Sequence, residues 1–451
     1  MEAGEVVLDQ NDAAHWIYRG EGAVNLVFAY TGSSPLFAGK VLRIQKVPRK
    51  KSQCASNTSV LSVYECRLWK DANDIVSSPT KDIAGQLYVQ NVMSPLLGSK
   101  HVDSGMRVRV SRDFLESVEK NVLSQRPTWR VDAAKINTLC DSALLMSDHS
   151  VFCQGTVKGE PSISIEIKPK CGFLPFSRFI AEGNDIKRSV SRFRMHQLLK
   201  LHHKEISQIS EYDPLDLFSG SKDRIYKAIM ALFTTPQNNL RVFLNGSLAF
   251  GGLGGGSDST YFVNSEALES ALMHAIRAED GLRTMRFIEL VAETVFKSKV
   301  LDLLLKVQKL DNFDIEGAIH AYYDVVSQPC MICRDMGEDN LLGKYAALHS
   351  ISLDESLQIV RDYLIAATAK DCSLMISFTS SEDGIRGSPY NDVYLESTNQ
   401  NFHYKANFID LDMKPLKKME LYYELDQKIV NYYVQMAKIE HEPEEAANIE
   451  V

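Results

Sequence analysis

The chain has 451 residues, of which 45% are hydrophobic and 24% charged, and its formal net charge is −8. Such a composition excludes a fibrous or wholly disordered protein and is typical of a globular chain with two or three domains. The acidic balance argues against general affinity for nucleic acid, so we expect no nucleic-acid partner. No apolar signal core or long apolar run is present, so we expect neither secretion nor a membrane partner.

The N-terminal region predicts a small antiparallel sheet with a glycine turn at its tip. Residues His15 to Tyr30 have the pattern of strand, turn and strand, and the turn contains Arg19-Gly-Glu-Gly22. A third strand is expected over Leu36 to Ile44. The turn can wrap phosphates with backbone N–H groups, but a tight hairpin that needs positive φ is an equal alternative. Lys40 and Arg43 point to opposite faces of the third strand, so only one of them can face a nucleotide.

The middle of the chain alternates strands with helices, which predicts an α+β body. Its most informative strand is Ile163 to Lys170, where isoleucines alternate with polar residues that include Glu166, Lys168 and Lys170. The alternation predicts one packed face and one reactive face. A solvated edge strand remains the alternative, because Pro169 and two lysines also suit an edge.

A helix is expected next, over about Ile186 to Lys204. At strict four-residue intervals it carries Arg188, Arg192, His196 and Lys200. Like charges at this spacing repel one another on one helix face, so the row predicts an anionic ligand, and a polyphosphate suits it best. A basic face in water is the competing interpretation.

Aspartates of two later segments can share one cleft. Asp371 is expected to begin a strand that the polar segment 379–401 joins to another strand ending near Asp412. One carboxylate would accept a hydroxyl proton while Asp410 holds Mg²⁺, as phosphoryl transfer requires. For Asp371 alone, a capping role is an equal alternative. The helix that follows has Pro415 in its first turn, and one of its faces carries Lys414, Lys418 and Tyr422.

A separate pattern predicts a structural metal site. The spacing His-x9-Cys-x2-Cys-x15-His is formed by His320, Cys330, Cys333 and His349. Two thiolates and two imidazoles supply a tetrahedral zinc shell. A redox dithiol is the alternative, although no thioredoxin-like βαβ pattern surrounds the cysteines.

The chain resembles the inositol pentakisphosphate 2-kinases, particularly those of plants, from about Trp16 to Tyr422. The resemblance rests on Arg-Gly-Glu-Gly at 19–22, Glu-Ile-Lys-Pro-Lys-Cys-Gly-Phe-Leu-Pro at 166–175, Met-His-Gln-Leu-Leu-Lys at 195–200, Tyr-Asp-Pro-Leu-Asp-Leu-Phe-Ser-Gly at 212–220, Pro-Gln-Asn-Asn-Leu-Arg-Val-Phe-Leu-Asn-Gly at 236–246, Lys-Asp-Cys-Ser at 370–373 and Ile-Asp-Leu at 409–411. It implies a two-lobed fold distantly related to protein kinases. The protein-kinase His-Arg-Asp and Asp-Phe-Gly motifs are absent, which argues against a protein substrate.

The same resemblance implies a role for each matching residue. Around ATP it places Gly22, Asn25, Arg43, Asp148, His149, Glu166, Lys168 and Arg241. In contact with the substrate phosphates it places Arg130, Lys170, Lys200, Asn238, Lys414, Lys418 and Tyr422. Asp371 is then the base, Asp410 binds Mg²⁺, and the family's zinc falls on the four ligands named above. The chain departs from the expected pattern at Lys418, where we expect arginine, and at Ser147, where we expect asparagine.

These observations predict an N-lobe over residues 1–150, a C-lobe with the inositol phosphate and zinc sites over 151–440, and a disordered acidic tail over 441–451. The predicted activity is transfer of the ATP γ-phosphate to the 2-hydroxyl of inositol 1,3,4,5,6-pentakisphosphate, which gives the hexakisphosphate, phytate. The alternatives are a non-catalytic inositol phosphate sensor and a kinase for another small polar alcohol. We expect a monomer in the cytoplasm and nucleus.

Overall fold

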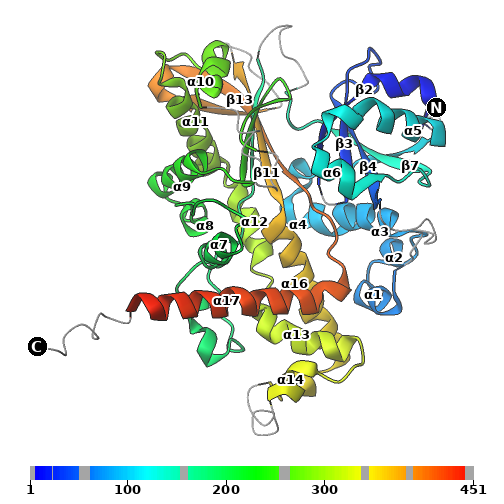
Figure 1. Cartoon of the computed structure of the whole chain (residues 1–451), viewed down its shortest axis with the longest axis vertical. Coiled ribbons are helices and arrows are strands. Elements are labelled where there is room, and N and C mark those ends of the chain that lie inside the picture. Colours follow the sequence, from blue (N-terminus) through cyan, green and yellow to red (C-terminus); the bar gives the residue numbers. More distant parts are fainter. Residues whose placement is uncertain are drawn as a thin grey trace, which may run out of the picture.

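The computed structural model describes residues 6–22, 24–49, 61–152, 161–252, 265–336, 345–381 and 390–441. Two β-sheets organise this part of the chain, one from its first third and one from the remainder (Figure 1). The protein is therefore a mixed α+β protein, as predicted. The expected acidic tail lies outside the described residues from 442 onward, whereas His441 is the last residue of a helix.

The N-terminal sheet has the strand order β1-β5-β7-β4-β3-β2, with β6 paired to β4. Its strands are β1 (Val7–Leu8), β2 (Trp16–Glu21), β3 (Asn25–Tyr30), β4 (Lys40–Pro48), β5 (Met106–Val110), β6 (Ala134–Ile136) and β7 (Ser142–Ser147). The glycine turn joins β2 to β3, as expected. The third strand begins at Lys40 and not at Leu36, because Ser34 accepts the backbone N–H groups of Phe37 and Ala38 and holds the intervening residues in a turn.

The C-terminal sheet has the strand order β10-β9-β8-β11-β13-β12, and all its pairings are antiparallel. Its strands are β8 (Ile163–Ile167), β9 (Leu240–Leu244), β10 (Ser247–Phe250), β11 (Ser373–Ser381), β12 (Asn391–Leu395) and β13 (Gln400–Ile409). Parts of the glycine-rich segment 246–259 and of the polar segment 379–401 form strands of this sheet. Residues 253–264 and 382–389 of those segments lie outside the described residues.

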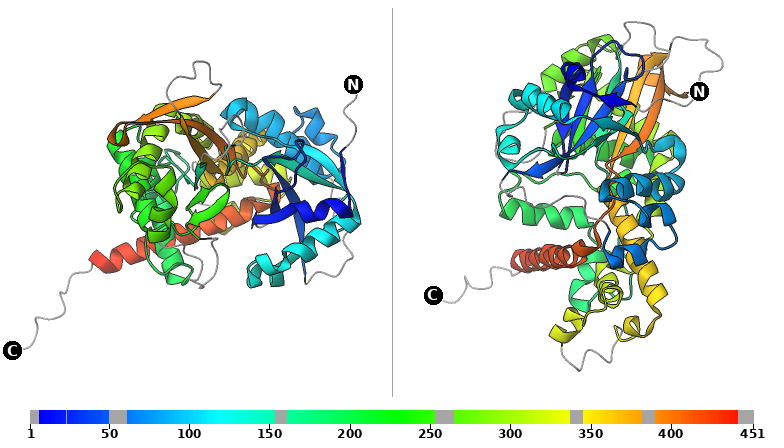
Figure 2. Two further views of the ribbon diagram at one scale, coloured as in Figure 1. Left: turned by 90° about the horizontal axis from the view of Figure 1, so that it is seen from above. Right: turned by 90° about the vertical axis from the view of Figure 1, so that its right-hand side faces the viewer.

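Helices lie along one side of the C-terminal sheet and continue below it, and a smaller group covers the N-terminal sheet (Figures 1 and 2). The α-helices of the described residues are α1 (Val63–Leu68), α2 (Asn73–Val76), α3 (Lys81–Tyr88), α4 (Ser94–Leu97), α5 (Arg112–Val122), α6 (Thr128–Ala133), α7 (Arg192–His202), α8 (Pro214–Leu217), α9 (Lys222–Thr234), α10 (Ser265–Ala271), α11 (Arg283–Ser298), α12 (Val300–Gln308), α13 (Asp314–Val325), α14 (Met331–Met336), α16 (Leu353–Asp371) and α17 (Met419–His441). Three short 3-10 turns matter below, namely η5 (Glu182–Arg188), η8 (Leu348–Ser350) and η10 (Leu416–Lys418). None of these helices is both long and apolar enough to cross a membrane.

Two hydrophobic cores stabilise the two sheets separately. The smaller core packs α5 against the N-terminal sheet, with Trp16, Phe28 and Phe114 buried at its centre. The larger core contains the C-terminal sheet, and it also includes apolar residues of the segment from Leu61 to Val102. That segment therefore packs with the C-terminal sheet although it precedes β5 in sequence.

A third, small cluster fixes one helix that matters for the candidate site. Met195 and Leu199 of α7 pack against Ile429 and Val430 of α17. Ser191 caps the start of α7 by accepting the N–H of Arg194, which is why a new helix begins there. In Figure 1 α17 runs across the molecule below the sheets, and the side view of Figure 2 shows it nearly end-on. The row of Arg192, His196 and Lys200 lies on the adjoining face of α7, because each residue turns the helix by about 100°.

Candidate active site

The predicted reactive strand lies at the centre of the C-terminal sheet. All five residues of β8 are buried between β9 and β11, so the solvated edge-strand alternative is wrong. After β8 the backbone of Lys168 donates to the Asn239 carbonyl at 2.9 Å, and the Tyr212 hydroxyl donates to the Pro169 carbonyl at 2.8 Å. Lys170 then adopts a left-handed φ of 61°, which is uncommon for a non-glycine residue. Lys168 and Lys170 lie in this turn after the buried strand, and both are partly exposed.

Asp371 is the last residue of α16, so the expectation that it begins a strand is wrong. A Ser352–Glu355 capping box starts this 19-residue helix, which continues to Asp371, and β11 begins only at Ser373. The pairing of Ser373 with Ile409 in the neighbouring strand still brings Asp371 close to the segment after β13. The pairing supports the predicted proximity of Asp371 and Asp410, although Asp371 ends a helix and does not begin a strand.

Cations surround the Asp371 carboxylate. Lys414 donates to it at 2.6 Å. Burial acts to raise the pKa of Asp371, but the charges of Lys414, Lys170 and Lys168 outweigh burial and hold that pKa below its ordinary value. The carboxylate is therefore ionised at neutral pH and can accept a proton.

A second acidic group lies at the end of β13. Asp410 has a left-handed φ of 61°, and both carboxylate oxygens of Asp412 lie 3.2 Å from Arg43 of β4. Burial raises the pKa of Asp410, and the nearby carboxylates of Glu166 and Asp412 raise it further, against the opposing charges of Arg43 and Lys168. Excess negative charge of this kind is what a bound divalent cation neutralises.

Glu166 connects this acidic group to a further arginine. Its carboxylate accepts from the Ser373 hydroxyl at 2.9 Å and from Arg241 of β9 at 3.3 Å. The charge of Arg241 in turn lowers the pKa of Arg130 on α6, after burial, which is the larger cause. Arg130 also donates to the Gly22 carbonyl of the glycine turn at 3.2 Å. Residues of the two sheets therefore meet at this place.

The basic row is present but shorter than predicted. Arg192, His196 and Lys200 lie on α7, whereas Arg188 lies in η5, where it binds Asp185 at 3.0 Å and the Ser177 carbonyl at 2.8 Å. Arg188 is therefore not part of the row, because the cap at Ser191 interrupts the expected helix.

The remaining row crowds against Lys170. Burial lowers the pKa of His196 to about 3, helped by the charges of Arg192, Lys200 and Lys170. Burial also lowers the pKa of Lys170 to about 8, and Lys168, Lys200 and Arg192 add to this effect while Asp371 opposes it. This concentration of basic side chains, in a chain of net charge −8, is an arrangement whose charge a polyanion would neutralise.

The start of α17 contributes to the same place, although the helix begins later than expected. Lys414 precedes it, and Pro415 stands before η10, which contains Lys418. Tyr422 lies in the first turns of α17, near enough to Lys414 and Asp371 for their charges to act on its pKa, which burial chiefly raises. Lys418 is exposed to solvent.

The glycine turn and the connection after β7 form the other side of the site. Asn25 opens β3, and its carbonyl accepts the Gly22 N–H at 3.0 Å. Gly22 has no positive φ, so the alternative of a hairpin that requires one is wrong at this residue. Asp148 is buried and accepts from Arg19 at 2.9 Å.

Two further predicted residues lie near the site without joining the charged cluster. The Nε2 of His149 is buried and has no hydrogen-bond partner among the described residues, and burial lowers the pKa of this side chain. A buried ring nitrogen without a partner is a group that a ligand can satisfy. Asn238 is exposed in the turn before β9.

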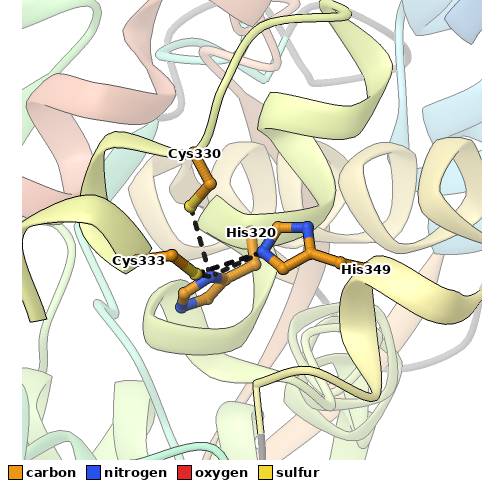
Figure 3. A group of neighbouring side chains, drawn as sticks. All are labelled: His320, Cys330, Cys333 and His349. Carbon is orange, nitrogen blue, oxygen red and sulfur yellow. Dashed lines mark hydrogen bonds between the residues drawn. The ribbon is translucent and has the colours of Figure 1, made fainter. Parts of the chain in front are cut away.

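The predicted metal ligands converge (Figure 3). The Nδ1 of His320 lies 3.3 Å from the Nε2 of His349, 3.4 Å from the Cys330 sulfur and 3.2 Å from the Cys333 sulfur. Two nitrogens that each lie about 2.0–2.1 Å from a tetrahedral zinc ion are about 3.3 Å apart. The second nitrogen of His349 lies 3.0 Å from Asp324, which orients the ring as carboxylates do beside metal-bound histidines. The four side chains therefore fit a tetrahedral zinc ion.

Within the described part of the chain, one other group of side chains has the spacing of metal ligands, but an ammonium group occupies its centre. Asp314, Glu316 and Asp426 lie within 4.8 Å of one another. The Nζ of Lys187 binds them at 2.5, 3.0 and 2.7 Å respectively, and all four side chains are buried. We call these four residues the Lys187 cluster. Asp426 also accepts from Nε of Arg192 at 3.1 Å, so the cluster reaches the basic row.

Several residues that matter for this geometry were not predicted from the sequence. Asp412 stands two residues after Asp410, and the pattern Ile-Asp-Leu-Asp was a usable signal. The Lys187 cluster had no such signal, because its members are distant in sequence and each resembles an ordinary surface residue.

Comparison with known proteins shows a single family. The family model for inositol-pentakisphosphate 2-kinase matches residues 18–428. The chain is 56% identical over 448 residues to the inositol-pentakisphosphate 2-kinase of Arabidopsis thaliana, and the aligned residues cover 98% of each chain. It is 53% identical over 439 residues to that of Oryza sativa subsp. japonica, with 97% of this chain and 98% of the relative covered. The zebrafish (Danio rerio) enzyme of the same description is 31% identical, with 95% and 94% covered.

Proposed function

The chain belongs to the inositol-pentakisphosphate 2-kinase family, and from that premise we propose how its residues phosphorylate inositol pentakisphosphate. The chain is a kinase, and its reaction gives inositol hexakisphosphate. The observation that carries the assignment of the site is the convergence of Lys168, Lys170 and Lys414 on the Asp371 carboxylate.

Asp371 acts as the general base in this proposal. Its ionised carboxylate accepts the proton of the axial 2-hydroxyl as that oxygen forms a bond to the γ-phosphorus of ATP. The bond between the γ-phosphorus and the β–γ bridging oxygen breaks, and ADP leaves with the electron pair. Lys168, which acts on the pKa of both Asp371 and Asp410, stabilises the charge that develops between the two carboxylates.

The five substrate phosphates explain the number of cations. The proposed phosphate contacts are Arg130, Lys170, Arg192, His196, Lys200, Asn238, Lys414, Lys418 and Tyr422. A single phosphate would not require cations from the β8 turn, α7 and the start of α17 together. A small neutral alcohol would not require them at all, and a sensor would not require both Asp371 and Asp410. Of these readings, the kinase for inositol pentakisphosphate is the one we retain.

The nucleotide lies on the opposite side of Lys168 in this proposal. Its proposed contacts are Gly22, Asn25, Arg43, Asp148, His149, Glu166, Lys168, Arg241 and Asp410. Asp410, together with Asp412 and Glu166, fits Mg²⁺, because the three carboxylates lie near one another, and because desolvation and their mutual repulsion raise the pKa of Asp410. Mg²⁺, when bound, neutralises phosphate charge. The four-ligand cluster on His320 fits Zn²⁺ and, when filled, stabilises the fold without taking part in the chemistry.

The two sheets correspond in this proposal to the two lobes of a distantly protein-kinase-like fold. The ATP lobe lies within residues 1–150 and the larger lobe within 151–440, except that the segment from Leu61 to Val102 packs with the larger lobe. We propose a monomer of the cytoplasm and nucleus that binds neither nucleic acid nor membrane.

The test of the base is Asp371→Asn, measured with Mg-ATP and separated inositol pentakisphosphate isomers. We expect turnover to fall at least about a thousandfold while inositol pentakisphosphate still binds, because the amide cannot accept the proton. Asp362→Asn, on the same helix and paired with Gln358 at 2.7 Å, is the matched control and should keep full activity. Wild-type turnover in Asp371→Asn would remove Asp371 from the role of base.

A further inference from the structure

A single buried side chain joins the two segments that carry Lys170 and Asp371. Gln308, the last residue of α12, is 0% exposed. Its Oε1 accepts the N–H of Gly172 at 2.8 Å, and its Nε2 donates to the carbonyl of Lys170 at 2.8 Å and to that of Ala369 at 3.2 Å. The amide therefore binds the chain on both sides of Cys171 and two residues before Asp371.

Both segments need such support. Lys170 has a left-handed φ of 61°, so the turn after β8 is not one that its own backbone favours. Gly172 packs so closely on Phe218 that an added Cβ would lie 2.3 Å from the ring, and the turn therefore cannot shift in that direction. Asp371 stands at the final position of α16, where the last carbonyl groups of a helix have no partner within the helix.

Side chains close to Gln308 also link the end of α12 to the same two segments. Asp311, three residues after Gln308, accepts from Lys370 at 2.6 Å. Lys370 also lies over the ring of Phe173, 5.1 Å from its centroid. The end of α12 therefore holds the residue next to Asp371 and the residues after Lys170 through side chains as well as through backbone groups.

Building on the proposed function, we propose that Gln308 is a positioning residue that fixes the phosphate-binding Lys170 relative to the base Asp371. Its single amide makes three hydrogen bonds to the backbone of the two segments, so neither segment can move without the other. The proposal concerns geometry, because Gln308 lies behind the two residues and does not touch the reacting atoms.

Glutamine is the side chain whose chemistry suits this place. The amide offers one acceptor group for the Gly172 N–H and two donors for two carbonyl groups. Methionine has a similar length but leaves the N–H and both carbonyls unsatisfied in a buried place. Ionised glutamate keeps the acceptor but turns an oxygen toward the carbonyls of Lys170 and Ala369.

The first test compares Gln308→Met with Gln400→Met. Gln400 is a matched control, because it is also buried, at 6% exposure, and it also binds backbone groups, namely the Arg277 N–H at 2.7 Å and the Ala275 carbonyl at 3.2 Å, away from the site. We expect Gln308→Met to lower kcat/KM for inositol pentakisphosphate by about tenfold to a hundredfold, since misplacement by about 1 Å can cost that much. KM for ATP should stay within about twofold.

The control should lose stability without this kinetic change. A kcat/KM for inositol pentakisphosphate within twofold of wild type in Gln308→Met, an equal loss in Gln400→Met, or an equal rise in KM for ATP would each overturn the proposal.

Gln308→Glu adds a readout that a merely structural role would not produce. A buried carboxyl has a raised pKa, and in its protonated form it recovers one donor. The activity of Gln308→Glu relative to wild type should therefore rise as the pH falls from 8 to 6, while the same ratio for Gln308→Met stays flat. A flat ratio for Gln308→Glu would contradict the proposal.

The outcome does not depend on whether the variants fold. If both Gln308 variants fail to fold, hydrogen exchange on the wild-type chain decides: the Gly172 amide should be as protected as those of β8, and exchange at the rate of an open loop would overturn the proposal. A failure of the proposed function would be seen separately, as a wild-type protein that does not phosphorylate inositol pentakisphosphate.

Discussion

At Lys170, burial and the neighbouring cations act together to disfavour the charged form of the side chain. Burial and three neighbouring cations lower its pKa to about 8, from 10.5, while Asp371 opposes them. The unfolded chain therefore binds more protons than the folded chain between about pH 8 and 10.5, so the free energy of unfolding rises with pH in this window as far as Lys170 determines it. A bound polyanion raises the pKa of Lys170 again, because its negative charge favours the protonated lysine. Binding should therefore be coupled to protonation of this lysine.

Lys170→Arg tests that coupling. Arginine stays charged, so the affinity of wild type for inositol pentakisphosphate, relative to that of the variant, should fall about tenfold between pH 7 and 9. Calorimetry without ATP measures the affinity of wild type and of the variant at each pH. The ratio of the two affinities is informative because protonation of the ligand phosphates affects both equally and cancels. Lys417→Arg, an exposed lysine outside the site, is the control and should give a flat ratio. A flat ratio for Lys170→Arg as well would contradict the coupling.

At the scale of elements, α7 owes its position to α17 through one apolar contact and one ionic contact. The apolar contact consists of Met195 and Leu199 against Ile429 and Val430. The ionic contact is the Lys187 cluster, where Asp426 of α17 binds both Lys187 of η5 and Arg192 of α7. The three carboxylates of the cluster come from α13 and α17, so Lys187 and Arg192 together stabilise the junction of four elements.

Lys187→Met should destabilise the protein strongly. Removal of one partner from a buried ion pair typically costs about 3–5 kcal/mol, because it leaves uncompensated buried charge, and here three carboxylates would remain. Urea unfolding of the variant measures the loss. Lys204→Met, at an exposed lysine, should change the free energy of unfolding by less than about 0.5 kcal/mol. Equal stability of the two variants would show that the Lys187 cluster contributes little.

The proposed zinc ligands come from α13, α14, η8 and the segment before α14, so the metal should stabilise these elements together. We expect about one zinc ion per purified chain by metal analysis, and we expect Cys333→Ala to lose that zinc and to unfold at a lower temperature. Cys140→Ala, in the N-terminal part and distant from the zinc ligands in sequence, should keep the metal. A wild-type chain that is free of zinc and equally stable with a chelator would refute the site.

Some elements could be predicted from sequence because their patterns are local. The alternation in β8, the four-residue spacing on α7 and the Cys-x2-Cys pair each lie within a few residues. The predictions that were wrong concerned the residues at which helices and strands begin and end. Ser191 interrupts the helix expected from Ile186 through Arg188, and the capping box at Ser352 starts a helix that continues to Asp371. Gln308 and Lys187 could not be found from sequence, because their roles depend on contacts between distant segments.

At the scale of the whole molecule, a few polar contacts connect the two sheets beside the candidate site. Arg43 of β4 binds Asp412 beyond β13. Arg19 of β2 binds Asp148 at 2.9 Å and also donates to the carbonyl of Gly246 in the turn between β9 and β10. Gly246 has a φ of +78°, and an added Cβ would lie 2.6 Å from the Arg19 guanidinium, so the turn and the arginine fit closely. The glycine turn is thereby held against the C-terminal sheet.

Arg19→Met should therefore weaken ATP binding more than inositol pentakisphosphate binding. Without the arginine, the glycine turn that we place over the ATP phosphates is no longer fixed to the C-terminal sheet, so KM for ATP should rise severalfold while KM for the inositol phosphate stays within about twofold. Gly246→Ala should act in the same direction, because it displaces Arg19 and requires a φ that alanine disfavours. Arg112→Met removes an exposed arginine paired with Glu116 in the same N-terminal part and should leave both constants unchanged. If steady-state kinetics gave an unchanged KM for ATP in both Arg19→Met and Gly246→Ala, the glycine turn would keep its position by its own β2–β3 pairing, and the contact between the sheets would have no part in nucleotide binding.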